Sequence, residues 1–237
     1  MEILNENDVN VMLDDMLREP KEFWNGFYED RTKNIPFFQM TGPDENLVSI
    51  FQKGISIERV LELGCGPGRN AIYMAKNGSK VDALDISENA IEWAKERALG
   101  EKVSIQFLCK SLFDIHLEAE IYDFIYDCGM FHHLAPHRRV TYLTIVKNAL
   151  KPNGHFGLVC FNTKGAVATS DYDVYKGRSL NKGIGYTEER LKTILNSHFE
   201  IQEFREMEKQ PPQSSMFGED FLWTSLMKKR GDDFSAS

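Results

Sequence analysis

The sequence contains no hydrophobic run long enough to cross a membrane. A membrane-spanning helix needs about 18 or more consecutive apolar residues, and no segment of the 237-residue chain reaches that length. The first residues, Met1 to Glu6, are polar and acidic, whereas a signal peptide begins with positive charge followed by an apolar stretch. We therefore expect a cytoplasmic protein with no membrane partner.

Cysteine is scarce, and its spacing argues against a zinc site. The chain has four cysteines, Cys65, Cys109, Cys128 and Cys160, and no two of them form a C-x-x-C pair. Structural zinc sites normally contain such a pair. Each cysteine lies at or near the end of a predicted buried strand. We expect all four to be reduced and packed as small hydrophobic side chains, with no metal bound.

Positive charge is also in short supply. The chain has 28 Lys and Arg against 36 Asp and Glu, which gives a net charge of −8 and a pI near 5.3. An acidic surface repels phosphate backbones, so we expect no nucleic-acid partner. Hydrophobic residues make up 42% of the chain, which suffices for a full core. The length is that of one large α/β domain with some additions.

A glycine turn at Gly64, Gly66 and Gly68 is the feature around which the rest of the sequence is arranged. An apolar run over residues 60–63 predicts a buried strand before it, and a helical pattern begins at Asn70. Glycines at alternate positions permit a sharp turn and leave no side chain between backbone and ligand. The following helix offers free N–H groups and the positive end of its dipole. The turn therefore predicts a site for a nucleotide-like ligand.

The spacing of these glycines distinguishes between nucleotide ligands. A dinucleotide fingerprint is G-x-G-x-x-G, and Arg69 stands where its third glycine would be, which disfavours a nicotinamide or flavin site. Residues 62–68, Glu-Leu-Gly-Cys-Gly-Pro-Gly, instead resemble the first motif of class I S-adenosylmethionine-dependent methyltransferases. The resemblance implies S-adenosylmethionine as the cofactor. The residues that it places around this cofactor are Glu62, Gly64, Cys65, Gly66 and Gly68.

Strand and helix patterns alternate after residue 58, which predicts a parallel sheet with helices on both faces. The expected strands are 59–63, 80–84, 103–109, 122–126, 155–161, 199–204 and 221–227. The expected helices are 70–77, 87–100, 136–150 and one capped by Thr187, with a turn at 151–154. The order resembles the seven-stranded, Rossmann-like α/β sheet of the methyltransferase family, which is mostly parallel with an antiparallel last strand.

The N-terminal segment is expected to form a helical cap. Residues 1 to about 33 have helical patterns broken at Pro20, and an apolar stretch at 35–38 is expected to be extended. The predicted parts are therefore a cap or lid over 1–45, a methyltransferase domain over 46–230 and a disordered tail over 231–237.

The aromatic segment 23–31 loosely resembles the N-terminal cover of small-molecule methyltransferases of the thiopurine and tellurite-resistance type. This implies that Trp24 and Arg31 contact the cofactor. Arg31 is expected to share a helical face with Trp24 and Tyr28 and to pair with the methionine carboxylate. The alternative is an amphipathic helix whose aromatic rings only fill the edge of the sheet.

Acidic residues follow two of the predicted strands. Asp85 ends the second strand, where one carboxylate can accept hydrogen bonds from both hydroxyls of a ribose. After the third strand, the resemblance implies that Asp114 accepts from the adenine amino group. Ile86, Leu112 and Phe113 are expected to flank the adenine ring or, alternatively, to belong to the core.

The fourth strand leads into Asp127, and His132 and His133 follow shortly after. In the resembled family this strand end adjoins the sulfonium, which implies that Asp127 lies at the cofactor. The Asp or Asn-Pro-Pro-Tyr or Phe tetrapeptide of methylases that act on planar amide or adenine nitrogens is absent here. A histidine can act as a general base near neutral pH. The alternatives are a packed or capping histidine and, together with His137, a metal site.

These patterns predict an S-adenosylmethionine-dependent methyltransferase that acts on a small-molecule acceptor with a sulfur, oxygen or nitrogen nucleophile. The reaction is an in-line displacement from a good leaving group, so the enzyme mainly supplies proximity and alignment. We expect a monomer or homodimer. The alternative function is a sensor or assembly subunit that binds S-adenosylmethionine without catalysis.

Overall fold

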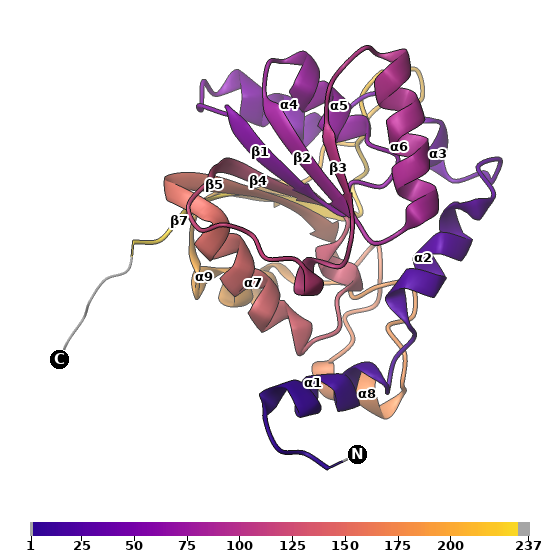
Figure 1. Cartoon of the computed structure of the whole chain (residues 1–237), viewed down its shortest axis with the longest axis vertical. Coiled ribbons are helices and arrows are strands. Elements are labelled where there is room, and N and C mark those ends of the chain that lie inside the picture. Colours follow the sequence, from indigo (N-terminus) through magenta and orange to yellow (C-terminus); the bar gives the residue numbers. More distant parts are fainter. Residues whose placement is uncertain (1, 232–237) are drawn as a thin grey trace.

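A computed structural model describes residues 2–231 of the chain, which form one seven-stranded sheet in the order β3-β2-β1-β4-β5-β7-β6 (Figure 1). The strands are β1 (Arg59–Leu63), β2 (Lys80–Asp85), β3 (Gln106–Cys109), β4 (Tyr122–Cys128), β5 (Leu150–Phe161), β6 (Phe199–Glu206) and β7 (Leu222–Lys229). β7 pairs antiparallel with β5 and β6, and the remaining pairs are parallel. The predicted Rossmann-like sheet with an antiparallel last strand is confirmed.

Helices cover both faces of the sheet, as Figure 1 shows. On one side lie α4 (Glu45–Gln52), α5 (Arg69–Lys76) and α6 (Glu88–Gly100); on the other lie α7 (Arg138–Ala149) and α9 (Glu188–Asn196). Ser87 caps α6 and Thr187 caps α9 through hydrogen bonds from Ala90 N and Arg190 N, as the sequence predicts.

The two faces of the sheet follow the alternation of side chains along each strand. In β1, Leu61 and Leu63 pack into the core on the α7 side, whereas Val60 packs into the core on the α5 side. Glu62 has the parity of Val60, so this buried acid lies on the face that α5 covers. The carboxylate is thereby held beside the start of α5.

The cap contains α1 (Glu6–Asp14), α2 (Pro20–Glu29) and α3 (Pro36–Gln39). Proline suits the first position of a helix because its missing N–H would have no partner there. Pro20 therefore begins α2 after the break that it was predicted to cause. The prediction that residues 35–38 are extended is wrong, because residues 36–39 form the short helix α3. α2 lies beside α6, near the carboxyl ends of the first strands (Figure 1).

Some element bounds differ from those predicted. β3 begins at Gln106 rather than 103, and β5 begins at Leu150, so the expected turn at 151–154 lies inside a strand. The strand is irregular there: its register against β4 shifts and Asn153 has a φ of 65°. Helix α8 (Asp171–Lys176) lies in the 162–185 stretch, where no period is visible in the sequence. The tail predicted to be disordered lies outside the described residues beyond Gly231.

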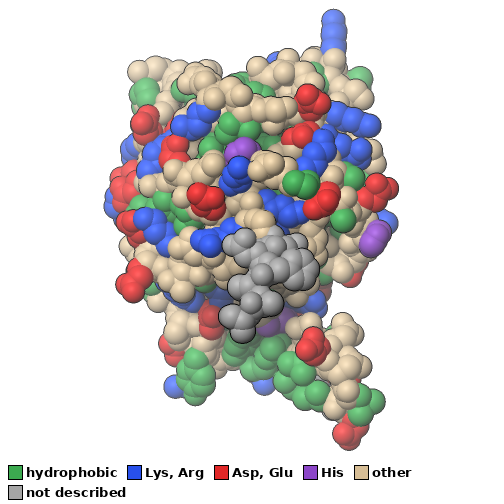
Figure 2. All heavy atoms as spheres, turned by 90° about the vertical axis from the view of Figure 1, so that its left-hand side faces the viewer, with side chains coloured by type: hydrophobic (Ala, Val, Ile, Leu, Met, Phe, Trp, Pro, Cys, Tyr) green, Lys and Arg blue, Asp and Glu red, His purple; other side chains and the backbone are tan. Residues whose placement is uncertain are grey.

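Within residues 2–231, no helix is both long and apolar enough to cross a membrane. Acidic and basic side chains are interspersed on the face shown in Figure 2. All four cysteines are free. Cys65 and Cys160 are buried as predicted, but Cys109 is exposed, because β3 is an edge strand that the neighbouring helices leave partly uncovered.

Candidate active site

The glycine turn joins β1 to α5 and has the backbone conformation that its sequence predicts. Gly64 and Gly66 both have positive φ, 65° and 51°. A Cβ atom on Gly64 would lie 2.8 Å from the Met130 side chain, and one on Gly66 would lie 2.9 Å from the Tyr28 hydroxyl. Glycine is therefore required twice over, by conformation and by the close approach of neighbours. Cys65 between them is buried, and its N–H donates to Leu84 O.

Asp85 ties the glycine turn to the end of β2. One carboxylate oxygen accepts from Gly66 N at 2.8 Å and the other from Ser87 N at 2.9 Å. Burial raises the pKa of Asp85, and these N–H groups oppose that rise. Because a carboxylate has about four lone-pair sites, Asp85 retains capacity to accept further donors next to the turn.

A second group of charged side chains lies on the α5 side of the turn. Arg69, the first residue of α5, donates to Cys128 Sγ at 3.2 Å, and its guanidinium lies 4.4 Å from the centre of the Phe217 ring. Glu62 is buried, and burial raises its pKa to about 8, although the positive charge of Arg69 lowers it. Asp44, the N-cap of α4, completes the group. Neither Arg69 nor Asp44 was among the predicted site residues.

The Asp127 carboxylate accepts hydrogen bonds from residues around it. One oxygen accepts from Met130 N at 2.8 Å, and the other accepts from the Tyr142 hydroxyl at 2.6 Å. Burial raises the pKa of Asp127 to about 6 against these hydrogen bonds. The side chain therefore holds the turn after β4 and the start of the η2 turn (Phe131–His133) in place.

The two histidines of that turn differ in their surroundings. His132 stacks on Phe161 with ring centres 3.8 Å apart, and its Nδ1 accepts from Phe161 N at 3.2 Å, which places the proton on Nε2. His133 packs edge-on against Trp24, with ring centres 4.8 Å apart. Burial lowers the pKa of His132 well below its usual range. The pKa of His133 is lowered to about 3, mainly by burial and to a lesser extent by the charge of Arg18. Both imidazoles are neutral at physiological pH.

The residues predicted around the adenine lie on and near the turn η1 (Leu112–Asp114). Leu112 is fully buried in the core, Phe113 packs against that core, and Ile86 is half-buried at the end of β2. Asp114 is exposed on the turn. The core alternative therefore applies to Leu112, while adenine contacts by Ile86, Phe113 and Asp114 remain predictions.

The cap helix α2 lies over the glycine turn and the histidines. The Tyr28 hydroxyl reaches Gly66, and Trp24 reaches His133. Between them the Asn25 side chain accepts from Glu88 N at 2.8 Å and from Ser87 Oγ at 3.0 Å, which fastens α2 to the start of α6. Asn25 and Tyr28 were not predicted as site residues; only their position within an aromatic helix marks them in the sequence.

Arg31 does not share a helical face with Trp24 and Tyr28, because α2 ends at Glu29. Its guanidinium forms an ion pair with Glu96 on α6 and lies 5.3 Å from the centre of the Trp93 ring. The expected helical placement of Arg31 is therefore wrong, and its charge is directed to the outer face of α6.

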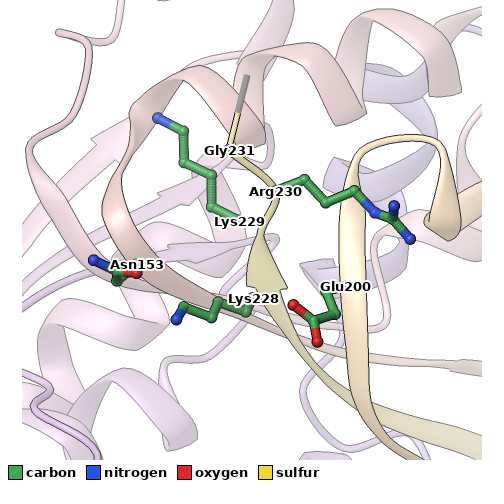
Figure 3. A pocket seen from close by; sticks show the side chains of 6 residues that line it. All are labelled: Asn153, Glu200, Lys228, Lys229, Arg230 and Gly231. Atoms are coloured by element: carbon green, nitrogen blue, oxygen red, sulfur yellow. The ribbon is translucent and has the colours of Figure 1, made fainter. Parts of the chain in front are cut away.

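The hollow shown in Figure 3 lies at the opposite end of the sheet. Its lining residues are Asn153, Glu200, Lys228, Lys229, Arg230 and Gly231. They come from the first parts of β5 and β6 and from the end of β7 and the residues after it, whereas the glycine turn follows the carboxyl end of β1. Lys229 and Arg230 donate to the backbone oxygens of Leu150 and Phe199, which is a structural role.

Comparison with known proteins agrees with this geometry. Residues 60–154 match the family model described as a methyltransferase domain. An uncharacterized methyltransferase of Schizosaccharomyces pombe is 36% identical over 85 residues, which are 36% of this chain and 59% of that protein. The cyclopropane-fatty-acyl-phospholipid synthase of Escherichia coli K12 is 37% identical over 107 residues, 45% of this chain and 27% of the synthase. The chain thus spans less than two thirds of these relatives.

Solved structures share the fold over nearly the whole chain. One, described as the conversion of a disulfide bond into a thioacetal group during echinomycin biosynthesis, has a TM-score of 0.71 at 19% identity and covers 91% of this chain and 93% of its own. The 1,6-didemethyltoxoflavin-N1-methyltransferase of Burkholderia thailandensis has a TM-score of 0.62 at 20% identity. The match covers 98% of this chain and 92% of that chain. Residues 60–154 thus match a methyltransferase domain, and the fold of the chain is similar to that of solved methyltransferases.

Proposed function

We propose that the chain is an S-adenosylmethionine-dependent methyltransferase that acts on a small-molecule acceptor. The observation that carries the proposal is the glycine turn closed by Asp85 and covered by α2. The turn approaches its neighbours so closely that a Cβ atom on Gly66 would touch Tyr28. Backbone N–H groups and a carboxylate beside such a turn suit the hydroxyls of a nucleoside. The names of several structural relatives, an N-methyltransferase among them, support a small acceptor.

Different residues of this chain would bind different parts of S-adenosylmethionine. Asp85 would accept from the ribose hydroxyls, the glycine turn would lie against the sugar and the methionine, and Ile86, Phe113 and Asp114 would lie along the adenine. When bound, the cofactor supplies an electrophilic methyl group on a good leaving group. Trp24 and Tyr28 would exclude water from that methyl group, because Tyr28 lies against Gly66 and Trp24 against His133.

The histidines favour an acceptor that needs little help from a base. His132 uses its Nδ1 to accept from Phe161 N, so it has no free lone pair on that nitrogen for a substrate proton. The pKa of His133, lowered to about 3, is far from the value near 7 at which an imidazole is an efficient base. We therefore assign both residues a positioning role. A soft or already ionised nucleophile, such as a thiolate that attacks without prior proton removal, suits this arrangement best.

The test is turnover with a panel of small acceptors grouped by nucleophile. Purified protein is incubated with S-adenosylmethionine, and S-adenosylhomocysteine formation is measured with thiols, phenols, amines and carboxylates of similar size. We expect turnover with at least one acceptor and an unchanged pH profile in His133→Gln. Tight binding of S-adenosylhomocysteine without turnover on any acceptor would favour a non-catalytic binding protein. An acid limb of the pH profile that disappears in His133→Gln would restore the histidine as base.

A further inference from the structure

Arg18 lies in the linker between α1 and α2, and no acidic side chain within residues 2–231 pairs with it. Its guanidinium stacks on the Phe23 ring, 3.5 Å from the ring centre, and its Nη1 donates to Asn181 O at 3.0 Å. The side chain is half-buried, and burial lowers its pKa with no acid acting against this effect. A partly desolvated charge without a counter-charge is costly, so Arg18 is suited to bind an anion.

Two acidic residues close to Arg18 in sequence are used elsewhere. The Glu19 carboxylate caps α2, and Asp14 pairs with Arg138 at the start of α7. The stretch 174–186, whose backbone Arg18 contacts, contains three basic residues and no acidic one. An anion that approaches Arg18 along this stretch therefore meets positive charge, although the whole chain has a net charge of −8.

The backbone that Arg18 contacts also packs against both histidines of the η2 turn. Asn181 lies two residues before Gly183, and a Cβ atom on Gly183 would lie 3.1 Å from His132 Cδ2 and 3.2 Å from His133 Cε1. One short segment thus joins the guanidinium to the two imidazoles. The positive charge of Arg18 reaches His133, because it contributes to the lowered pKa of that residue.

A row of rings leads from Arg18 to the same histidines along the cap. Phe23 packs edge-on against Trp24 with ring centres 5.1 Å apart, and Trp24 packs against His133 at 4.8 Å. His133 Nδ1 is buried and has no hydrogen-bond partner among the described residues. A charged group and a neutral polar group are therefore both left without an anionic or hydrogen-bonding partner where the cap meets the 162–185 stretch.

In the other direction, the histidines lead to the end of β4. Gly129 directly follows this strand with a φ of 113°, and a Cβ atom there would lie 3.8 Å from His132 Cε1. The end of β4 is where the sulfonium is expected to lie. An acceptor that extends from Gly129 along the imidazoles would therefore have its nucleophile at one end and its other end at Arg18.

We propose that Arg18 binds a carboxylate of the acceptor, so that the substrate is a small organic acid whose nucleophile reaches the end of β4. The inference rests on the proposed function and narrows its substrate class. A guanidinium can donate two parallel hydrogen bonds to one carboxylate. Of its five N–H groups, Arg18 directs only one to the Asn181 carbonyl oxygen. The single positive charge of Arg18 matches the single negative charge of a carboxylate.

This role makes Arg18 a residue that determines specificity and takes no part in methyl transfer. The stacking on Phe23 holds the guanidinium in one plane, and the hydrogen bond to Asn181 fixes its edge. Because these contacts already exist, little rotamer freedom is left to lose when a carboxylate binds. A neutral acceptor of the same size would leave the charge unpaired and would bind more weakly.

The experiment measures how matched acids and esters bind to the full chain saturated with S-adenosylhomocysteine. The probes are mercaptoacetate, 3-mercaptopropionate and 6-mercaptohexanoate, each compared with its methyl ester, because the three lengths place the carboxylate at different distances from the thiol. Calorimetry gives each Kd without any need for turnover. In the wild type we expect at least one acid to bind about 10-fold more tightly than its ester, as for a charged hydrogen bond.

Substitution of Arg18 should remove this preference. In Arg18→Gln the ratio of the ester Kd to the acid Kd should fall to about 1, while the Kd of the ester stays nearly unchanged. Arg18→Lys, which keeps the charge but not the planar fork, should retain part of the ratio. Arg31→Gln is the matched control in the cap: Arg31 already pairs with Glu96, so this variant should keep the full ratio.

The outcomes separate this inference from the proposed function. If no acid binds the wild-type complex more tightly than its ester, the inference fails, and the proposed function still stands on its own turnover test. If a folded Arg18→Gln variant keeps the preference for the acid, another group binds the carboxylate and the inference fails. If Arg18→Gln weakens acids and esters equally, Arg18 only holds the cap in place, which also overturns the inference. A wild type that does not bind S-adenosylhomocysteine would overturn the proposed function as well.

Discussion

The glycine turn and the cap meet at the same site but are held in different ways. The turn is fixed by buried hydrogen bonds that its own N–H groups donate, from Cys65 N to the Leu84 carbonyl oxygen and from Gly66 N to the Asp85 carboxylate. The cap is attached through side chains: the Asn25 amide at the start of α6, the exposed ion pair between Lys21 and Glu88, and the apolar cluster in which Tyr28 and Phe38 pack with Ala90 and Trp93 of α6.

From this difference we predict that the turn is a fixed part of the site and that the cap can move. The turn cannot change its conformation without disrupting β1 and β2, because its hydrogen bonds go to Leu84 and Asp85 at the carboxyl end of β2. Exposed ion pairs contribute little to stability, so we expect the apolar packing of the cap on α6 and the Asn25 hydrogen bonds to set the cost of any opening that admits ligands. The predictions below test the two regions in order of decreasing expected effect.

The largest effect concerns Glu62 on the sheet side. Its folded pKa, about 8, lies above the unfolded value of 4.5, so its contribution to stability is full below about pH 4.5 and is lost as the pH rises through 8. Glu62→Gln removes this loss. The variant should exceed the wild type in free energy of unfolding by on the order of 4 kcal/mol at pH 9, and by little at pH 5. Urea unfolding at both pH values measures it, and identical pH dependence would contradict the assignment.

Asp85→Ala should give the next largest effect, on ligand affinity. It removes a carboxylate proposed to accept from two hydroxyls, so binding of S-adenosylhomocysteine should weaken by about 2–3 kcal/mol. Calorimetry measures the affinity, and circular dichroism checks the fold. Asp85→Asn, which retains one acceptor oxygen, should lose less. Wild-type affinity in a folded Asp85→Ala variant would exclude Asp85 as the ribose ligand.

Asn25→Ala tests the attachment of the cap. Loss of its hydrogen bonds to Ser87 and Glu88 should destabilise α2 locally by about 1 kcal/mol, with global unfolding nearly unchanged. Hydrogen exchange over residues 21–40 should be faster in the variant. In the wild type, S-adenosylhomocysteine should add protection there. Equal protection with and without ligand would mean that the cap only packs against the domain.

Arg31→Gln should have the smallest effect. The ion pair with Glu96 is exposed, so the melting temperature should fall by less than about 2 °C. Thermal unfolding measures this. A large drop in S-adenosylhomocysteine affinity in this variant would restore the pairing of Arg31 with the methionine carboxylate that the sequence predicts.

The sheet could be predicted from sequence because its signals are local. The apolar run before Gly64, the cap Ser87 and the cap Thr187 each depend on a few neighbouring residues, and each is found where expected. The irregular start of β5 could not be predicted, because Lys151 to Gly154 resemble a turn and only pairing with neighbouring strands makes them part of a strand.

The site was predictable only in part, for a related reason. The glycine turn and Asp85 follow directly from strand ends. Arg69 was considered only as a missing glycine, and no pattern in the sequence marks Asp44 for the site; their proximity depends on how α4, α5 and β4 pack together. Arg31 was misplaced because a helix was extended two residues too far, past Glu29.

The contacts of Asp44 have a consequence for how the protein assembles. Its amide donates to Asn70 and its carboxylate accepts from Tyr126, across 26 and 82 residues of chain. Contacts between such distant segments carry an entropic cost for closing the loops between them. The charged end of the site is therefore completed only when α4, α5 and β4 have packed together. A ligand bound there would protect finished molecules from unfolding and leave nascent or damaged chains unaided.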